Sequence, residues 1–155
     1  MLPLLLSLLT GVTVGLRSMT APALVCWAAR LGRLNLENTW LEFLGSAPAA
    51  YILTVFAIAE LVADKLPKTP SRKTAPGIIA RVAGGALCGA ALDAGGIAGL
   101  LAGAAGGVAG TFLGYEFRMR LARALGGKDL AAALTEDAVA VGGAALIVFV
   151  FSQSL

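Results

Sequence analysis

Four long, largely apolar stretches constrain this chain more than any other feature of its sequence. They cover residues 3–30, 44–63, 96–117 and 130–151. Each is long enough to cross the roughly 30 Å hydrocarbon layer of a bilayer, for which a helix needs about 20 residues. Only 14% of the residues are charged, whereas soluble domains carry about a quarter. The sequence therefore predicts an all-α integral membrane protein with one domain over residues 1–155.

A shorter apolar stretch at 77–92 raises the expected number of spans to five. Between Val82 and Tyr115 the only charge is Asp93. A single helix over this interval would be about 51 Å long, which exceeds the thickness of a bilayer. Asp93 begins an Asp-Ala-Gly-Gly sequence that is typical of a turn. We therefore expect a turn at 93–96, with the stretch 77–92 either crossing fully or re-entrant.

The Lys and Arg residues predict the orientation of these spans. Nine of the twelve lie in 65–81 and 118–128, two segments that five spans place at the same face. Cytoplasmic loops collect Lys and Arg, so we expect the N-terminus in the cytoplasm and the C-terminus outside. The basic segment 65–76 is then a cytoplasmic loop beside anionic lipid. The segment 32–43 lies on the other face.

Glycines at short spacings mark the expected helix interfaces. Small residues let helices approach backbone to backbone, and this contact replaces the hydrophobic effect inside a membrane. The stripe faces either a helix of the same chain or a second subunit. Because five short helices make a thin bundle, we expect a homodimer. The glycines of the stripe are Gly85, Gly89, Gly99, Gly103, Gly106, Gly110 and Gly114.

An odd number of spans permits an inverted repeat of two helices, a linking helix and two more helices. Residues 8–32 align with 103–127, which pairs Gly11 with Gly106. Such matches arise easily in a chain rich in glycine and alanine. The span count is therefore the main reason for expecting a 2+1+2 inverted repeat.

Arg17 is the most unusual charge, because the five-span arrangement places it near the centre of the first span. An Arg at this depth costs about 2.5–3.5 kcal/mol. Nearby Ser18, Thr20 and Pro22 weaken a helix, so we expect the helix to break here and to present donors to a cavity. Three interpretations stay open for Arg17: an ion pair with a carboxylate of another helix, contact with a bound or permeating anion, and snorkelling.

Two pairs of acids extend this charged set. Glu60 and Asp64 are four residues apart and share one helix face. Glu136 and Asp137 lie about two turns into the last span if its helix begins near residue 129. We expect these four acids to line a shallow polar vestibule in the cytoplasmic half of the bundle, close to Arg81 and Arg118.

The residue types point to ions or small polar solutes. Carboxylates suit protons and hard cations, and Arg selects anions. The chain has no His and no catalytic motif, so we expect no enzyme, metal or cofactor. Its Lys and Arg residues lie between apolar stretches, so we do not expect it to bind nucleic acid. We expect a transporter or channel. The alternatives are a membrane scaffold whose charges form structural ion pairs, and a lipid-handling protein. The expected pathway residues are Arg17, Ser18, Thr20, Glu60, Asp64, Arg81, Glu136 and Asp137.

Four segments together resemble a known family. They are Gly15-Leu-Arg-Ser-Met19, Ala59-Glu-Leu-Val-Ala-Asp-Lys-Leu-Pro67, Arg81 at the start of a Gly/Ala-rich span, and Glu136-Asp137-Ala138. The chain resembles, over nearly its full length, the bacterial membrane family called domain of unknown function 4126. The resemblance implies a polytopic protein of the bacterial inner membrane and highlights Arg17, Glu60, Asp64 and Glu136. The family has no assigned activity, so it implies no substrate.

Overall fold

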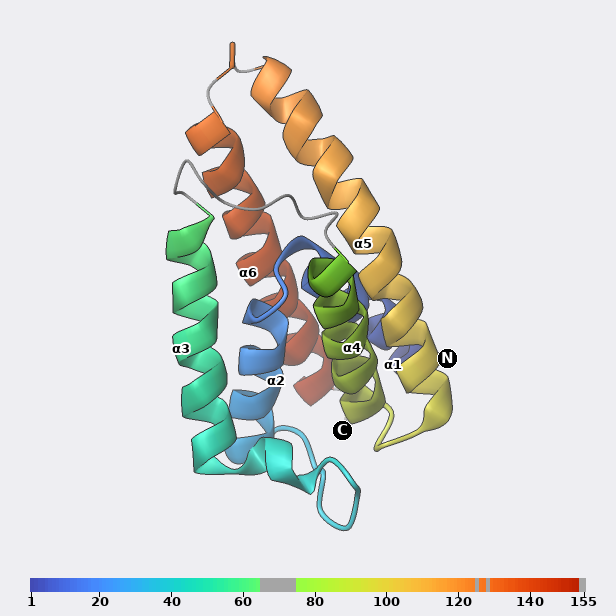
Figure 1. Ribbon diagram of the computed structural model, residues 1–155. Coiled ribbons are helices and arrows are strands. Elements are labelled where there is room, and N and C mark those ends of the chain that lie inside the picture. Colours follow the sequence, from blue (N-terminus) through green and yellow to red (C-terminus); the bar gives the residue numbers. More distant parts are fainter. Residues whose placement is uncertain (65–74, 125, 128, 154–155) are drawn as a thin grey trace.

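In the computed structural model, the described part of the chain is helical and contains no strand (Figure 1). The structure describes residues 1–64, 75–124, 126–127 and 129–153, without the side chain of residue 129. This confirms the predicted all-α class. The helices are α1 (Leu2–Leu16), α2 (Thr20–Arg30), the 3₁₀ turn η1 (Glu42–Gly45), α3 (Ala47–Ala63), α4 (Ala75–Leu92), α5 (Ile97–Ala124) and α6 (Asp129–Gln153).

The first predicted span, residues 3–30, is two helices that run in opposite directions. Within α1, the Ser7 hydroxyl donates to the Gly89 carbonyl on α4 over 2.9 Å, and Val14 lies next to Gly84. Residue numbers rise along α1 as they fall along α4, so these two helices are antiparallel. The chain then reverses, because Pro22 of α2 also lies near Gly84 while Leu92 lies beside Val25 and Ala28.

This reversal makes α1 and α2 a helical hairpin. With 15 and 11 residues, the two helices are about 22 Å and 16 Å long, which is short of the bilayer thickness. By length and composition, α4, α5 and α6 can cross, whereas α3 is apolar but has only 17 residues. Three helices meet the criterion, so the prediction of five is wrong, and α4, which covers the stretch 77–92, is one of the three.

The two ends of the bundle differ in charge. In Figure 1 the end of α5 and the start of α6 lie at the top, and the end of α3 and the start of α4 also point upward, so the described flanks of both basic segments face the same way, as their Lys and Arg content predicts. The segment 65–74 itself lies outside the described residues. The start of α1 and the end of α6 lie in the lower half of the view. The predicted sides of the two termini stay a prediction.

The predicted turn between α4 and α5 is confirmed. The Asp93 carboxylate accepts a hydrogen bond from the Gly99 N–H over 2.8 Å and so caps the start of α5. Gly95 in the turn has φ +85°, a backbone conformation that glycine adopts without strain. α5 therefore returns directly along α4.

The predicted glycine interface is confirmed, and it lies within one chain. A Cβ atom on Gly103 would lie 2.0 Å from the Gly85 carbonyl oxygen of α4, and one on Gly15 would lie 2.5 Å from Gly110 Cα of α5. Backbones in such contact leave no space for side chains. α1 and α4 thus fill the glycine stripe of α5, which removes the stripe as support for a homodimer. Four further glycines of the predicted interface are packed as closely. A Cβ atom on any of them would lie under 3.0 Å from an atom of α1, α4, α5 or the Asp93 side chain; they are Gly89, Gly99, Gly106 and Gly114.

The predicted inverted repeat is wrong. Gly11 of α1 lies beside Gly103 and Gly106 of α5, and Leu16 lies beside Gly114. Residue numbers therefore rise in the same direction along both helices. An inverted repeat would make the equivalent helices antiparallel.

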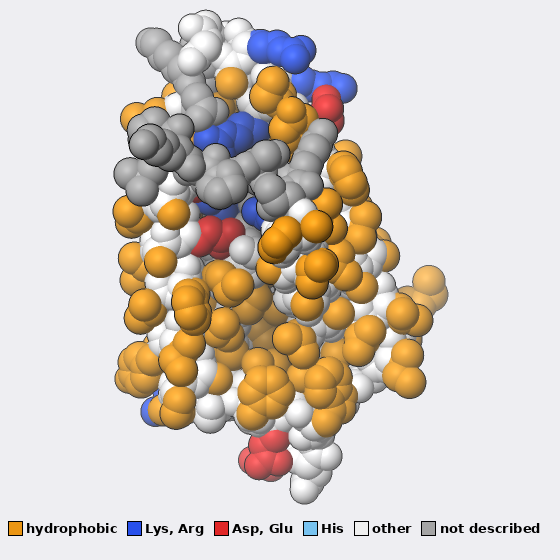
Figure 2. Space-filling view, in the orientation of Figure 1, with side chains coloured by type: hydrophobic (Ala, Val, Ile, Leu, Met, Phe, Trp, Pro, Cys, Tyr) orange, Lys and Arg blue, Asp and Glu red, His pale blue; other side chains and the backbone are white. Residues whose placement is uncertain are grey.

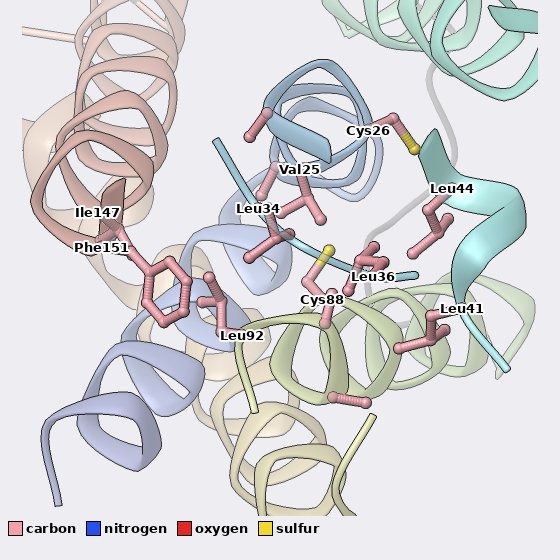
Figure 3. Packing of buried hydrophobic residues seen from close by; sticks show 14 of the residues in the cluster. Val25, Cys26, Leu34, Leu36, Leu41, Leu44, Cys88, Leu92, Ile147 and Phe151 are labelled. Atoms are coloured by element: carbon pink, nitrogen blue, oxygen red, sulfur yellow. The ribbon is translucent and has the colours of Figure 1, made fainter. Parts of the chain in front are cut away.

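The apolar core lies below the reversal between α1 and α2. Side chains of α2, the α2–η1 segment, α4 and α6 meet there, including Val25, Leu34, Leu92 and Phe151 (Figure 3). Hydrophobic side chains also cover most of the visible outer face, while basic ones gather toward the upper end (Figure 2). Exposed apolar residues over the length of a helix are what a lipid-facing surface requires.

Candidate functional site

The site is built on the three residues that separate α1 from α2. Arg17 has an extended backbone (φ −138°, ψ 113°), although its N–H still donates to the Thr13 carbonyl. Ser18 and Met19 follow, and α2 begins at Thr20. The first N–H groups of a helix have no partner within that helix. The reversal therefore directs unpaired backbone donors toward α3.

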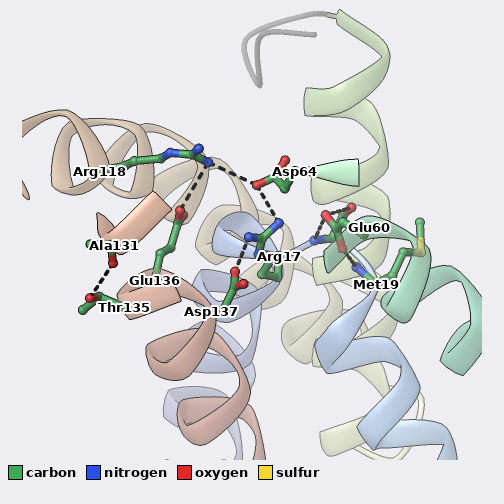
Figure 4. Close-up of polar contacts among 10 residues, drawn as sticks. Arg17, Met19, Glu60, Asp64, Arg118, Ala131, Thr135, Glu136 and Asp137 are labelled. Atoms are coloured by element: carbon green, nitrogen blue, oxygen red, sulfur yellow. Dashed lines mark hydrogen bonds and ion pairs between the residues drawn. The ribbon is translucent and has the colours of Figure 1, made fainter. Parts of the chain in front are cut away.

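Glu60 of α3 satisfies these donors (Figure 4). Its Oε1 accepts from the Ser18 N–H over 2.9 Å and from the Ser18 hydroxyl over 2.7 Å, and its Oε2 accepts from the Met19 N–H over 2.9 Å. A carboxylate at a helix N-terminus is stabilised both as a cap and by the helix dipole. Glu60 thus caps α2 from a different helix and fixes the place where the chain reverses.

The Arg17 guanidinium lies between two carboxylates (Figure 4). Its Nη1 is 2.6 Å from Asp64 Oδ2 of α3, and its Nη2 donates to Asp137 Oδ1 of α6. Arg17 exposes only 1% of its surface. Of the three interpretations, the structure shows the ion pair with carboxylates of other helices. Arg17 also lies at the tip of a hairpin, level with Asp64, and not at the centre of a crossing helix as predicted.

Arg118 of α5 joins the two acidic pairs. Its Nη1 is 3.2 Å from Asp64 Oδ2 and 4.0 Å from Glu136 Oε2. The sequence predicted Arg118 close to the vestibule acids but did not include it among the pathway residues. Its spacing could have done so, because Arg118 continues the four-residue stripe of Gly110 and Gly114 on α5.

The two remaining predicted pathway residues are Thr20 and Arg81. Thr20 is buried, and its hydroxyl has no hydrogen-bond partner within the described part of the chain. Arg81 is buried on α4, where its Nη1 donates to the Gly77 carbonyl over 3.1 Å. The contacts described above join Arg118 to six predicted residues, which are Arg17, Ser18, Glu60, Asp64, Glu136 and Asp137.

Burial makes these contacts strong and costly to break. Four carboxylates and two guanidinium groups gather here, and Glu136 is fully buried. Removing one partner of a buried ion pair leaves an uncompensated charge and costs about 3–5 kcal/mol. Replacing the whole network by apolar residues would cost little or would stabilise the fold. Stability alone therefore does not explain why the chain carries these charges.

The predicted water-accessible cavity reaching Arg17 stays a prediction. A cavity of about 560 Å³ lies at the other end of the bundle, between α2 and η1, where Gly32, Asn35, Glu42 and Ser46 contribute to its lining. Among the described residues, no three His, Cys, Asp or Glu side chains converge as a metal site would require. The described residues around Arg17 form a charge network at the tip of the hairpin.

The fold and site define a helical membrane protein in which a short helical hairpin holds a buried arginine at its tip. This chain belongs to the family described as Domain of unknown function (DUF4126), which matches residues 4–151 and confirms the resemblance. Comparisons with curated proteins and with solved structures find no match. The family description names no activity, so function is inferred from the site.

Proposed function

We propose that this protein is a small, non-enzymatic transporter that couples an ion or small polar solute to protons at the tip of the α1–α2 hairpin. The observation that carries this proposal is the break between α1 and α2 at Arg17–Met19, where Glu60 of α3 binds the backbone and Asp137 of α6 binds the Arg17 side chain. Discontinuous helices that present their ends to charged groups form the substrate and coupling-ion sites of many transporters. The sequence-based expectation of transport is retained in this form.

The acids of the network support a role for protons or hard cations. The carboxylates of Glu60, Asp64, Glu136 and Asp137 lie at the hairpin tip with Arg17 and Arg118, and carboxylates are the side chains that carry such ions through membrane proteins. In this proposal the network holds the hairpin tip in one position, and transport requires the tip or α3 to move.

Proton flux into proteoliposomes with an entrapped pH-sensitive dye tests this proposal. Asp137→Asn removes one of the two carboxylates that hold Arg17, and we expect it to reduce proton-coupled flux at least tenfold. Glu116→Gln is the matched control. Glu116 lies on the exposed side of α5, where its Oε2 is 3.7 Å from Arg120 Nε. Equal flux in the wild type, the Asp137 variant and empty liposomes would overturn the proposal.

A second candidate is a scaffold whose charges are structural. The observation that favours it is the complete burial of Arg17 between Asp64 and Asp137. A scaffold predicts that Asp137→Asn lowers the unfolding temperature while no solute moves in any variant. A transporter predicts that Asp137→Asn still folds but loses flux. Unfolding temperature and flux measured together therefore separate the two candidates.

We also propose that the basic end faces the cytoplasm in a bacterial inner membrane, following the positive-inside rule. We also propose a homodimer, although the glycine stripe no longer supports it because the stripe packs within one chain. Chemical crosslinking in the membrane tests it, and a monomer under all conditions would contradict it.

A further inference from the structure

The cavity between α2 and η1 has the size of a ligand pocket. Its volume is about 560 Å³, and pockets for small molecules typically enclose about 300–1,000 Å³. Two glycines of the lining keep it open: a Cβ atom on Gly32 would meet nothing within 4 Å, and one on Gly45 would make only ordinary contact with Ala29. The lining residues are separate from the charge network around Arg17, so this cavity is a second candidate site.

The segment between α2 and η1 that walls this cavity is anchored to the rest of the protein. Its side chains Leu34, Leu36 and Leu41 are buried in the apolar core. Trp40 Nε1 also donates to the Gly95 carbonyl in the α4–α5 turn over 3.0 Å. The wall is therefore fixed without a bound ligand, and the cavity is preformed, as most ligand pockets are.

The charged residues of the lining are both acids. Glu37 and Glu42 contribute to it together with two uncharged polar residues, Asn35 and Ser46. Both acidic side chains are exposed, and within the described part of the chain neither carboxylate has a hydrogen-bond or ion-pair partner. A concave surface with charges of one sign concentrates the field of those charges. The cavity therefore attracts cations.

The lining suits an organic cation better than a metal ion. Ca²⁺ takes about six to eight oxygen ligands, whereas no three acidic side chains converge among the described residues. Ala29, Leu34 and Leu36 add apolar surface to the same lining. Apolar surface gains nothing from a hydrated metal ion, but it packs against the carbon atoms next to an ammonium group.

Exposed aromatic side chains indicate the depth of the cavity in the membrane. Trp40 and Phe43, beside and within η1, are each 54% exposed, and Trp is enriched at the membrane–water interface. Figure 2 shows acidic side chains at this lower end, below a largely hydrophobic face. The cavity is thus level with the lipid headgroups, where both a dissolved amine and a lipid headgroup can reach it.

We propose that the cavity between α2 and η1 binds an organic ammonium group, with Glu37 and Glu42 as its anionic partners. A free primary amine and the headgroup of phosphatidylethanolamine share this group, so they are the two sources of the ligand. The inference is independent of the proposed function, because the hairpin tip is at the other end of the bundle.

Two binding measurements on the purified wild type test the inference and distinguish the sources. The first is calorimetry with ethanolamine hydrochloride in a maltoside detergent, with sodium chloride at the same ionic strength as the blank. The second is native mass spectrometry of protein released from vesicles of equal parts phosphatidylethanolamine and phosphatidylglycerol. Binding of ethanolamine supports a free amine as the ligand, and preferential retention of phosphatidylethanolamine supports the headgroup. The absence of both would overturn the inference.

The double variant Glu37→Gln, Glu42→Gln assigns the binding to this cavity. It removes both charges, keeps the size of the side chains and changes only exposed positions. We expect it to weaken ethanolamine binding by about tenfold or more, the value of one hydrogen bond between charged groups, and to abolish the preference for phosphatidylethanolamine. The control Glu116→Gln removes an exposed acid of α5 and should bind as the wild type does. Equal binding by the wild type and the double variant would overturn the inference.

A second variant tests the cavity without changing its charge. Gly45→Leu adds a side chain to the lining beside Ala29, where a Cβ atom would lie 3.8 Å from the Ala29 Cβ atom. Because the added side chain fills part of the cavity, we expect it to weaken binding of the same ligand by about tenfold. Thermal unfolding shows that the variant is folded. Wild-type affinity in a folded Gly45→Leu protein would place the ligand elsewhere and overturn the inference.

Discussion

At the scale of single residues, Arg17 and Glu60 have different roles at the tip of the α1–α2 hairpin. The Glu60 carboxylate binds backbone and hydroxyl donors and fixes the reversal of the chain. The Arg17 side chain then lies between Asp64 of α3 and Asp137 of α6. The position of Arg17 therefore depends on the cap that Glu60 provides.

We predict that Arg17→Ala destabilises the protein by about 3–5 kcal/mol, because it removes the buried cation that lies between Asp64 and Asp137. Chemical unfolding in detergent measures this loss. Arg120→Ala is the control, since the Arg120–Glu116 pair is 80% and 59% exposed and exposed pairs contribute about 0–1 kcal/mol. Equal unfolding free energies for the two variants would contradict the buried network.

At the scale of helices, the packing of α1, α4 and α5 depends on the absence of side chains. Gly103 lies at the centre of this contact, where Gly85 and Gly89 of α4 approach it on one side and Gly11 of α1 on the other. Close backbone packing supplies the attraction between helices that water supplies outside the membrane. The hairpin is thus held against the two crossing helices along most of α1.

Two Gly→Ala substitutions are predicted to have opposite effects. A Cβ on Gly103 would meet the Gly85 carbonyl oxygen at 2.0 Å, so Gly103→Ala forces the helices apart and costs about 1–3 kcal/mol or more. A Cβ on Gly142 of α6 meets nothing within 4 Å, so Gly142→Ala leaves the packing intact and gains about 0.5–1 kcal/mol of helix propensity. Thermal unfolding of both variants checks this. A loss at Gly142 equal to that at Gly103 would contradict the assigned interface.

The sequence identifies most of the site but not the reversal. Arg17, Asp64 and Asp137 are recognisable because charges in apolar stretches are costly and need partners. Hydropathy, however, is the same for one long helix and for two short antiparallel ones, so residues 3–30 look like a single span. The sequence also could not predict the partner of Glu60, because Glu60 binds backbone N–H groups that no side-chain pattern reveals.

At the scale of the whole molecule, the hairpin changes the topology. Because α1 and α2 form a hairpin, the start of α1 and the end of α6 lie in the lower half of the view, away from the end of α5 and the start of α6 (Figure 1). Five complete crossings would separate the chain ends across the membrane. The same pattern of Lys and Arg residues is therefore consistent with two topologies, and the hairpin places the start of α1 and the end of α6 on the same side.

We predict that cysteines introduced as Leu2→Cys and Ser152→Cys react with an impermeant thiol reagent from the same side of the membrane, and that Arg123→Cys reacts from the other. The native Cys26 and Cys88 are free and buried, so they give little background. Labelling of intact cells and inverted vesicles distinguishes the two sides. Leu2→Cys and Ser152→Cys reacting from opposite sides would restore five crossings and exclude the hairpin.

The most direct test is a double-mutant cycle between Arg17 and Asp137, which are 120 residues apart in the chain. Unfolding free energies of the wild type, Arg17→Gln, Asp137→Asn and the double variant give the coupling between the two side chains. If the hairpin tip holds Arg17 against α6, the coupling free energy is about 1–3 kcal/mol, as for residues in one ion-pair network. Additive effects, with a coupling below about 0.3 kcal/mol, would show that the two charges do not meet and would contradict the site.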